Sequence, residues 1–190
     1  MPLPESTGRT EMHLRRIEMR GYRRDDGLYE IEGRITDTKS YPHTIEERGE
    51  VQAGERIHDM WVRLVVDEQL VVHDVVAATD AMPYGECAGG PATMKAIVGA
   101  QIRAGWSMVV KERLGGAKGC THLMELLIPM ATTAYQTIAP LRLSRPPILD
   151  RQGVPLKIDS CYAYARNRSI VRRRWPKFYT GPDDTGDNAS

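Results

Sequence analysis

The sequence predicts an α+β domain, in which an antiparallel four-stranded meander is followed by helices that pack on one face of the sheet. Two observations lead to this fold class. Residues 13–79 contain runs of alternating apolar and polar residues, which are typical of strands, and clusters of turn-forming residues separate the runs. Residues 91–138 instead repeat their apolar residues at helical spacing. A run of strands followed by a run of helices favours helices gathered on one side of an antiparallel sheet.

Residues 13–39 predict the first hairpin of the meander. Ile17 and Met19 lie two residues apart before the turn at 25–27, where a glycine adopts positive φ at little cost. Gly33 interrupts the second strand and is expected to form a bulge. The apolar residues that share one face of this strand are Tyr29, Ile31 and Ile35.

Residues 38–56 are expected to form a long polar loop, because they include prolines, glycines and few apolar residues. The second hairpin follows, with a tip at residues 67–69 and a β-branched run from Leu70 to Thr79. The apolar residues that alternate along its first strand are Met60, Val62, Leu64 and Val66.

Three helices are expected after the sheet, over residues 91–99, 105–114 and 121–138. Pro91 is tolerated at the first position of a helix, and Gly115-Gly116 stops the second one. Pro129 should kink the third helix, because its ring blocks the backbone hydrogen bond to the Glu125 carbonyl.

The remaining segments complete one domain that we expect to span residues 12–180. Residues 1–11 and 181–190 are polar and are expected to be disordered. Residues 139–156 form a proline-rich strap without a core of its own. A C-terminal helix should follow, with Asp159 or Ser160 as its N-cap and Pro176 at its end.

The composition excludes several classes of partner and compartment. The net charge of +1 gives no general attraction to nucleic acid or to a membrane surface. No apolar run approaches the roughly 20 residues that cross a bilayer, and the N-terminus lacks the apolar core of a secretory signal. Three widely spaced cysteines do not form a disulfide framework. We therefore expect a cytoplasmic protein with a small-molecule substrate and no nucleic-acid or membrane partner; a homo-oligomer is left open.

Cys120 and His122 are the first candidate site, because both lie at the start of the third helix. The helix N-terminus favours a thiolate there, and an imidazole beside it can act as acid, base or metal ligand. Since positions i and i+2 of a helix point in different directions, the pair cooperates only if Cys120 lies in the cap. Packing of both side chains into the core is the alternative.

Loops at strand ends supply the other candidates. Asp80, Tyr84 and Cys87 lie in or beside the loop after the last strand, where functional residues are often placed. Asp37 closes one strand and His58 opens another, followed by Asp59, so that these ends could meet at one edge of the sheet and supply acid–base chemistry. Turn-forming hydrogen bonds are the alternative role for these aspartates.

A metal site is a further reading of the same residue types. Zinc or an iron–sulfur cluster could bind to Cys87, Cys120, His122 and Cys161, although no C-x-x-C motif is present and only the fold could bring them together. The basic run of residues 166–177 could bind phosphate or RNA, but a helix facing solvent or another subunit fits a neutral chain better.

Several motifs together resemble a bacterial family catalogued as domain-of-unknown-function family 2889. They are "RRIEMRGYRRDDGLYEIEGRITDTK", "HDMWVRL", "TDAMPY", "GCTHLMELL" and "CYAYARN…VRRRWPKFY", which together cover most of residues 12–180. The resemblance implies no activity, but it marks Asp37, His58, Asp59, Asp80, Cys87, Cys120, His122 and Cys161. The order of elements is also similar to that of NifU/SufE-type iron–sulfur scaffold proteins, although the Cys-x-Asp pairing expected of them is missing.

The favoured hypothesis is a cofactor-independent enzyme that acts on a small aromatic or hydrophobic molecule, because nucleotide and phosphate motifs are missing from the sequence. A lyase reaction, by elimination or retro-aldol cleavage, is favoured over hydrolysis, which suggests a role in the breakdown of aromatic compounds. The candidate catalytic residues are His122, Cys120, Asp80, Asp37 and His58, and the candidate substrate-binding residues are Cys87, Tyr84, Trp61 and Trp106. The alternatives are a metal, sulfur or iron–sulfur carrier, and a non-catalytic subunit that docks through its basic C-terminal helix.

Overall fold

The computed structural model describes residues 3–182 and divides the chain into two compact units, Met1–Ala139 and Pro140–Ser190. The division falls at the start of the proline-rich strap. Each unit is described by itself below.

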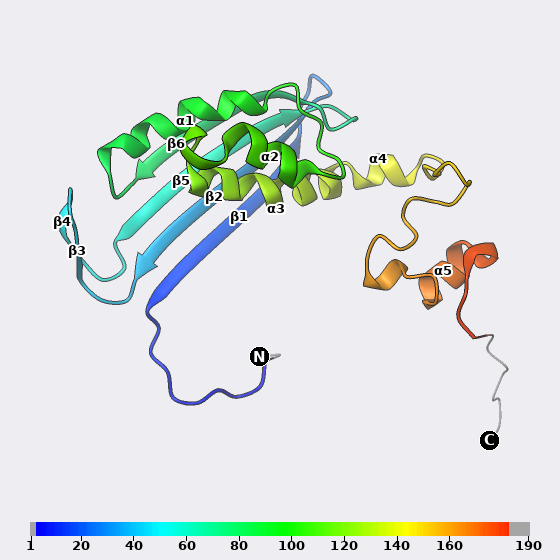
Figure 1. Ribbon diagram of the computed structural model, residues 1–190, viewed down its shortest axis with the longest axis horizontal. Coiled ribbons are helices and arrows are strands. Elements are labelled where there is room, and N and C mark those ends of the chain that lie inside the picture. Colours follow the sequence, from blue (N-terminus) through cyan, green and yellow to red (C-terminus); the bar gives the residue numbers. More distant parts are fainter. Residues whose placement is uncertain (1–2, 183–190) are drawn as a thin grey trace. The chain divides into compact units, whose positions relative to one another are not determined.

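A four-stranded antiparallel sheet forms the base of the first unit (Figure 1). Its strands are β1 (His13–Arg23), β2 (Tyr29–Lys39), β5 (Arg56–Val66) and β6 (Val72–Ala81), in the spatial order β1-β2-β5-β6. Neighbours in the sheet are therefore successive long strands of the chain, which confirms the predicted meander. The turn at Gly27 has φ of 85°, which explains the glycine there.

The expected polar loop at 38–56 contains a small hairpin instead. Strands β3 (His43–Ile45) and β4 (Gly49–Val51) pair with each other in a separate two-stranded sheet. The turn between them is closed by a hydrogen bond from the Arg48 amide to the Ile45 carbonyl, and Gly49 has φ of 74°. The prediction missed it because the strands have three residues each, too few to show a period of two.

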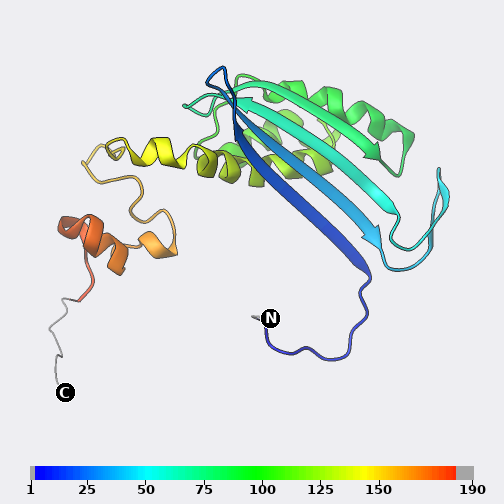
Figure 2. The same cartoon turned by 180° about the vertical axis from the view of Figure 1, so that it is seen from behind.

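Helices cover one face of the sheet, and among residues 3–139 the opposite face carries none (Figures 1 and 2). The expected helix at 91–99 is a series of short helical segments, because glycines and a proline interrupt it. The expected second and third helices are confirmed. The segments in order are η1 (Gly85–Gly89), α1 (Gly90–Thr93), η2 (Met94–Ile97), α2 (Trp106–Leu114), η3 (Gly116–Lys118) and α3 (Thr121–Thr137).

The core lies between the sheet and helix α3. Alternate residues of β2 and β5 point towards the helices, and one stripe of α3 meets them. The fully buried residues of this layer include Ile31, Ile35, Met60, Val62, Leu64, Leu123, Leu126, Leu127 and Met130. This packing fixes the first turn of α3 over the ends of β2 and β5, where the polar site described below is found.

Two strand glycines allow α3 to lie close to the sheet. Gly33 does not form the predicted bulge, because β1 and β2 keep a continuous register through it. A Cβ at Gly33 would lie 3.1 Å from the sulfur of Met130. A Cβ at Gly21 would clash with the Thr137 hydroxyl, which itself donates to the Thr133 carbonyl.

Replacing Gly21 with alanine should therefore destabilise the first unit by about 1–3 kcal/mol, as overpacking does in other cores. The double variant Gly21→Ala/Thr137→Ala should recover most of the loss, because the second change removes the group that clashes. Urea unfolding of both variants measures this. Equal stability of the single and the double variant would show that α3 does not lie against β1 at this point.

The second unit contains short helices rather than the predicted single C-terminal helix. They are α4 (Ala139–Leu143), which begins at the boundary, η4 (Tyr162–Tyr164), α5 (Ser169–Arg174) and η5 (Pro176–Phe178). Asp159 has φ of 61°, so it cannot begin a helix, and its carboxylate accepts hydrogen bonds from Arg166. Of the expected disordered tail, residues 183–190 lie outside the described residues. Within residues 3–182, no helix combines the length and the apolar character needed to cross a bilayer.

Candidate functional site

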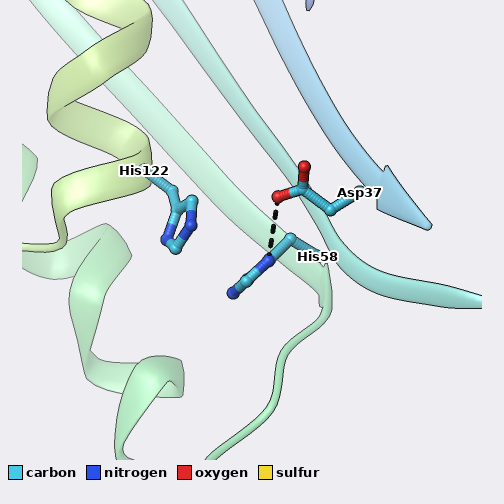
Figure 3. A group of neighbouring side chains, drawn as sticks. All are labelled: Asp37, His58 and His122. Atoms are coloured by element: carbon cyan, nitrogen blue, oxygen red, sulfur yellow. Dashed lines mark hydrogen bonds and ion pairs between the residues drawn. The ribbon is translucent and has the colours of Figure 1, made fainter. Parts of the chain in front are cut away.

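Asp37 and His58 face each other across the sheet, at the end of β2 and the start of β5. They are register partners, and both lie on the face that the helices cover. His58 Nδ1 lies 3.0 Å from Asp37 Oδ2 (Figure 3). The register shifts directly after Asp37, and such bulges often redirect side chains beside functional sites. The predicted meeting of these strand ends is therefore found.

The Asp37 carboxylate is almost completely buried, and its contacts hold it as an anion. Arg15 donates from Nε to Oδ1 at 2.8 Å and from Nη2 to Oδ2 at 2.9 Å, and His13 Nε2 lies 2.9 Å from Oδ1. Burial by itself would raise the pKa of Asp37, but the hydrogen bonds and charge of Arg15, together with the hydrogen bond from His13, outweigh it and lower the pKa. Asp37 is thus a fixed negative charge that orients His58.

His122 places a second imidazole against the first. It projects from the first turn of α3, and its ring centroid lies 3.8 Å from that of His58, with the planes 32° apart (Figure 3). Burial and then the nearby His122 lower the pKa of His58, against the opposing effect of Asp37. His58 is therefore neutral at physiological pH. Because the carboxylate only accepts, the proton of neutral His58 lies on Nδ1 and leaves the lone pair of Nε2 available as a base.

Cys120 is the N-cap residue of α3, in extended conformation and half-buried, and so fulfils the condition for cooperating with His122. Burial raises the pKa of its thiol, but the His122 side chain and the backbone N–H groups of Leu123 and His122 lower the pKa below its usual value. Two glycines make room for this segment. A Cβ at Gly90 would lie 3.0 Å from Cys120 Cβ, and one at Gly119 would lie 2.9 Å from the Leu114 carbonyl oxygen.

Cys120 should react with iodoacetamide at lower pH than an ordinary cysteine. The variant Cys87→Ser/Cys161→Ser isolates this thiol, and its alkylation rate against pH gives the midpoint. Adding His122→Gln should raise the midpoint, because the largest contact that favours the thiolate is lost. A midpoint that stays unchanged in the triple variant would show that His122 does not act on the thiol.

The two imidazoles and the thiol line an open cleft of about 840 Å³. Its walls come from the β3–β4 hairpin, the start of β5, the loop after β6 and the N-terminus of α3. This cleft brings Cys87 and Tyr84 to the same space as Cys120, His58 and His122. The other lining residues include Lys39, His43, Thr44, Ile45, Glu46, Ile57, Pro83, Glu86 and Thr93.

Three further candidates lie elsewhere. Asp80 accepts a hydrogen bond from Trp61 Nε1 at 3.0 Å, on the sheet face away from the helices, where Arg34 also stacks on the Trp61 ring. Trp106 is buried in the core and donates to the Leu127 carbonyl at 2.8 Å. Asp80, Trp61 and Trp106 are therefore not brought to the cleft, because strand alternation and core packing direct them away from it. Asp59, next to His58, is buried beneath Arg34 and Arg56 on that opposite face.

The residues marked for metal binding are divided between the two units. Cys87, Cys120 and His122 line the cleft, whereas Cys161 belongs to the second unit and is exposed there. A different group converges among the described residues. One ligand atom from each of Asp37, His58 and His122 lies within 4.8 Å of the other two.

Sequence reasoning missed Arg15 and His13, the two side chains of β1 that contact the Asp37 carboxylate. Both lie on β1 at the same two-residue alternation as Ile17 and Met19, so that they share the helix-facing side. That alternation was the available signal. It could not be used without the register that pairs Arg15 with Asp37.

Comparison with known families decides the classification of the chain. The sequence model of a family described as "Protein of unknown function (DUF2889)" matches residues 13–136. The chain belongs to the DUF2889 family. The matched region contains the sheet, helices α1 and α2, nearly all of α3 and the whole cleft. No curated protein and no solved structure gave a significant match, so the weaker likeness to NifU/SufE-type scaffolds has no support from them.

Proposed function

We propose that this DUF2889 protein is an enzyme that acts on a small organic molecule by acid–base catalysis in the cleft. The observation that carries the proposal is the Asp37–His58 pair with a second imidazole stacked on it. An oriented neutral histidine beside another histidine supplies a proton acceptor and a proton donor within one site. The buried carboxylate keeps the acceptor in the tautomer that exposes Nε2 to the cleft.

A retro-aldol cleavage fits this arrangement better than hydrolysis. His58 Nε2 would take the proton of a substrate hydroxyl, and its electron pair forms a new carbonyl as the neighbouring carbon–carbon bond breaks. The electrons of that bond pass to the leaving fragment as an enolate, which then takes a proton from His122. Water in the open cleft carries the proton gained by His58 back to His122, so that both rings return to their starting states. The step needs no oxidant and no second substrate. Cys120 lies beside His122, where its thiol can position the carbonyl of the leaving fragment.

Tyr84, Ile45 and Ile57 give part of the cleft an apolar lining, which supports an aromatic or hydrophobic substrate. We accordingly place the enzyme in the breakdown of aromatic compounds. The unpaired state of all three cysteines is compatible with a cytoplasmic location.

The test is aldehyde release from a panel of aryl-substituted β-hydroxy carbonyl compounds, with the wild-type chain and His58→Gln. His73→Gln is a matched control, because His73 also pairs with an aspartate, Asp67 at 2.9 Å, but does not line the cleft. Release that is lost in His58→Gln and retained in His73→Gln supports the proposal. Equal loss in both variants, or no release from any compound, contradicts it.

A metal-dependent function is the second candidate, favoured by the convergence of Asp37, His58 and His122. His58 Nε2 and His122 would hold a zinc or iron ion, which would polarise a substrate oxygen. Asp37 fits such a site poorly, because each of its oxygens already accepts two hydrogen bonds. Elemental analysis of the purified chain distinguishes the two functions: about one metal ion per chain, lost in His122→Gln, would replace the acid–base proposal.

A further inference from the structure

The wall of the cleft next to Asp37 carries two nitrogen-bearing side chains that the proposed chemistry does not use, Lys39 and His43. Lys39 lies two residues after Asp37 on β2, on the same face, and β1 and β2 keep a regular register there. Since a strand rises about 3.4 Å per residue, the two backbone positions lie about 7 Å apart. His43 follows on β3.

Tyr41 lies between these two side chains in sequence and contacts both. The ammonium of Lys39 lies 5.4 Å from the centre of its ring, and the ring of His43 meets it edge-on at 6.2 Å between centroids. A cation over an aromatic face is held by the ring's negative surface. Tyr41 is thus placed to keep Lys39 and His43 on the same side of the cleft.

Within the described residues, neither the Lys39 ammonium nor the Nδ1 atom of His43 has a carboxylate partner. The buried Nδ1 of His43 has no hydrogen-bond partner of any other kind among these residues. The His43 ring also lines the cleft, where it can hydrogen-bond to a ligand. The acids of the cleft wall, Glu46 and Glu86, are exposed, where water screens their charge.

We propose that Lys39 and His43 form an anion subsite, and that the cleft takes a small monocarboxylate with an apolar or aromatic body. The carboxylate pairs with the Lys39 ammonium and accepts a hydrogen bond from the His43 ring. The apolar body lies against Ile45, Ile57 and Tyr84, which line the same cleft. The part of the molecule away from the carboxylate then reaches His58 and His122. This inference rests on the proposed function, because it names the substrate class of that site.

Binding of simple probes to the whole chain tests the subsite without any turnover. Benzoate, benzamide and benzylamine share one apolar body and differ in charge. Titration followed by backbone amide NMR should show benzoate bound at least tenfold more tightly than benzamide, with shifts at residues 39–45 and 57–58. Benzylamine should bind more weakly than benzamide.

Variants assign the preference to the named residues. Lys39→Met and His43→Leu should each reduce the preference for benzoate over benzamide about tenfold. Lys157→Met is a matched control, because Lys157 also lies over a tyrosine, 5.0 Å from the Tyr164 ring, in the second unit. It should keep the full preference. If a variant fails to fold, the comparison of benzoate with benzamide on the wild-type chain still decides.

Equal binding of benzoate and benzamide, or shifts confined to the arginines of the second unit, would overturn the proposal. Repeating the titration with His58→Gln separates it from the proposed function. Benzoate binding that persists in a chain without aldehyde-releasing activity would leave the subsite in place and remove the lyase. Aldehyde release from neutral substrates, by a chain that binds benzoate no more tightly than benzamide, would support the lyase and overturn the subsite.

Discussion

Replacing His58 with glutamine is expected to lower the rate of substrate cleavage by about 10²- to 10⁴-fold, the usual contribution of a positioned general base. Glutamine keeps much of the volume of histidine and can still donate to Asp37, but it has no titratable lone pair to take a proton. The rate constant at saturating substrate should carry the loss, because His58 acts on the reacting hydroxyl rather than on the body of the substrate. Steady-state kinetics on the best compound of the aryl β-hydroxy carbonyl panel measures this.

His122→Gln should also lower this rate, because glutamine cannot supply the proton that the leaving fragment takes from His122. A chain in which His58→Gln retains more than about a tenth of the wild-type rate would contradict the role of His58 as base. The far-ultraviolet circular dichroism of both variants should match that of the wild-type chain.

Replacing Asp37 with alanine is expected to lower the free energy of unfolding by about 3 kcal/mol. The change leaves Arg15 without its bidentate partner and removes the acceptor of both His13 and His58. Arg15 is partly exposed and also pairs with Glu125, so water and that carboxylate compensate part of the loss. Urea unfolding at pH 7 measures the difference.

The loss should also depend on pH with a defined sign. The pKa of Asp37 is lowered in the folded state, so its contribution is complete above the unfolded pKa of about 3.9 and disappears as pH falls through the folded value. The stability difference between wild type and Asp37→Ala should therefore shrink below about pH 4. Asp59→Ala is the control, because Asp59 is equally buried and paired on the other face. It should destabilise the chain and leave cleft chemistry intact; a pH-independent difference for Asp37→Ala would contradict the ion-pair account.

The sheet could be predicted because short stretches of the sequence indicate its strands and its first turn. Alternation of Met60, Val62 and Leu64, and a glycine in the first turn, are features of a few neighbouring residues and need no knowledge of the rest of the chain. The β3–β4 hairpin and the broken C-terminal helix could not be predicted, because they depend on three-residue strands and on the positive φ of Asp159.

The convergence of the candidate site could be predicted where it depends on strand ends and a helix start, as with Asp37, His58, Cys120 and His122. It was missed where it depends on register, as with Arg15. Asp80 was wrongly expected at the cleft for a related reason. Like Asp37 and His58, it lies near the end of a strand, in this case β6. Its carboxylate, however, accepts a hydrogen bond from Trp61 on the opposite face of the sheet. A difference of one residue in the strand is enough to move a side chain from one face to the other.

The protonation of the His58 ring tests the central claim most directly, and nitrogen-15 NMR of the imidazoles measures it. We predict a neutral ring at pH 7 with its proton on Nδ1, and a titration midpoint below 6.5. The midpoint should fall further in Asp37→Asn, which removes an effect that raises the pKa, and rise in His122→Gln, which removes one that lowers it. A charged His58 at pH 7, or a midpoint that rises in Asp37→Asn, would contradict the account of His58 as an oriented neutral base.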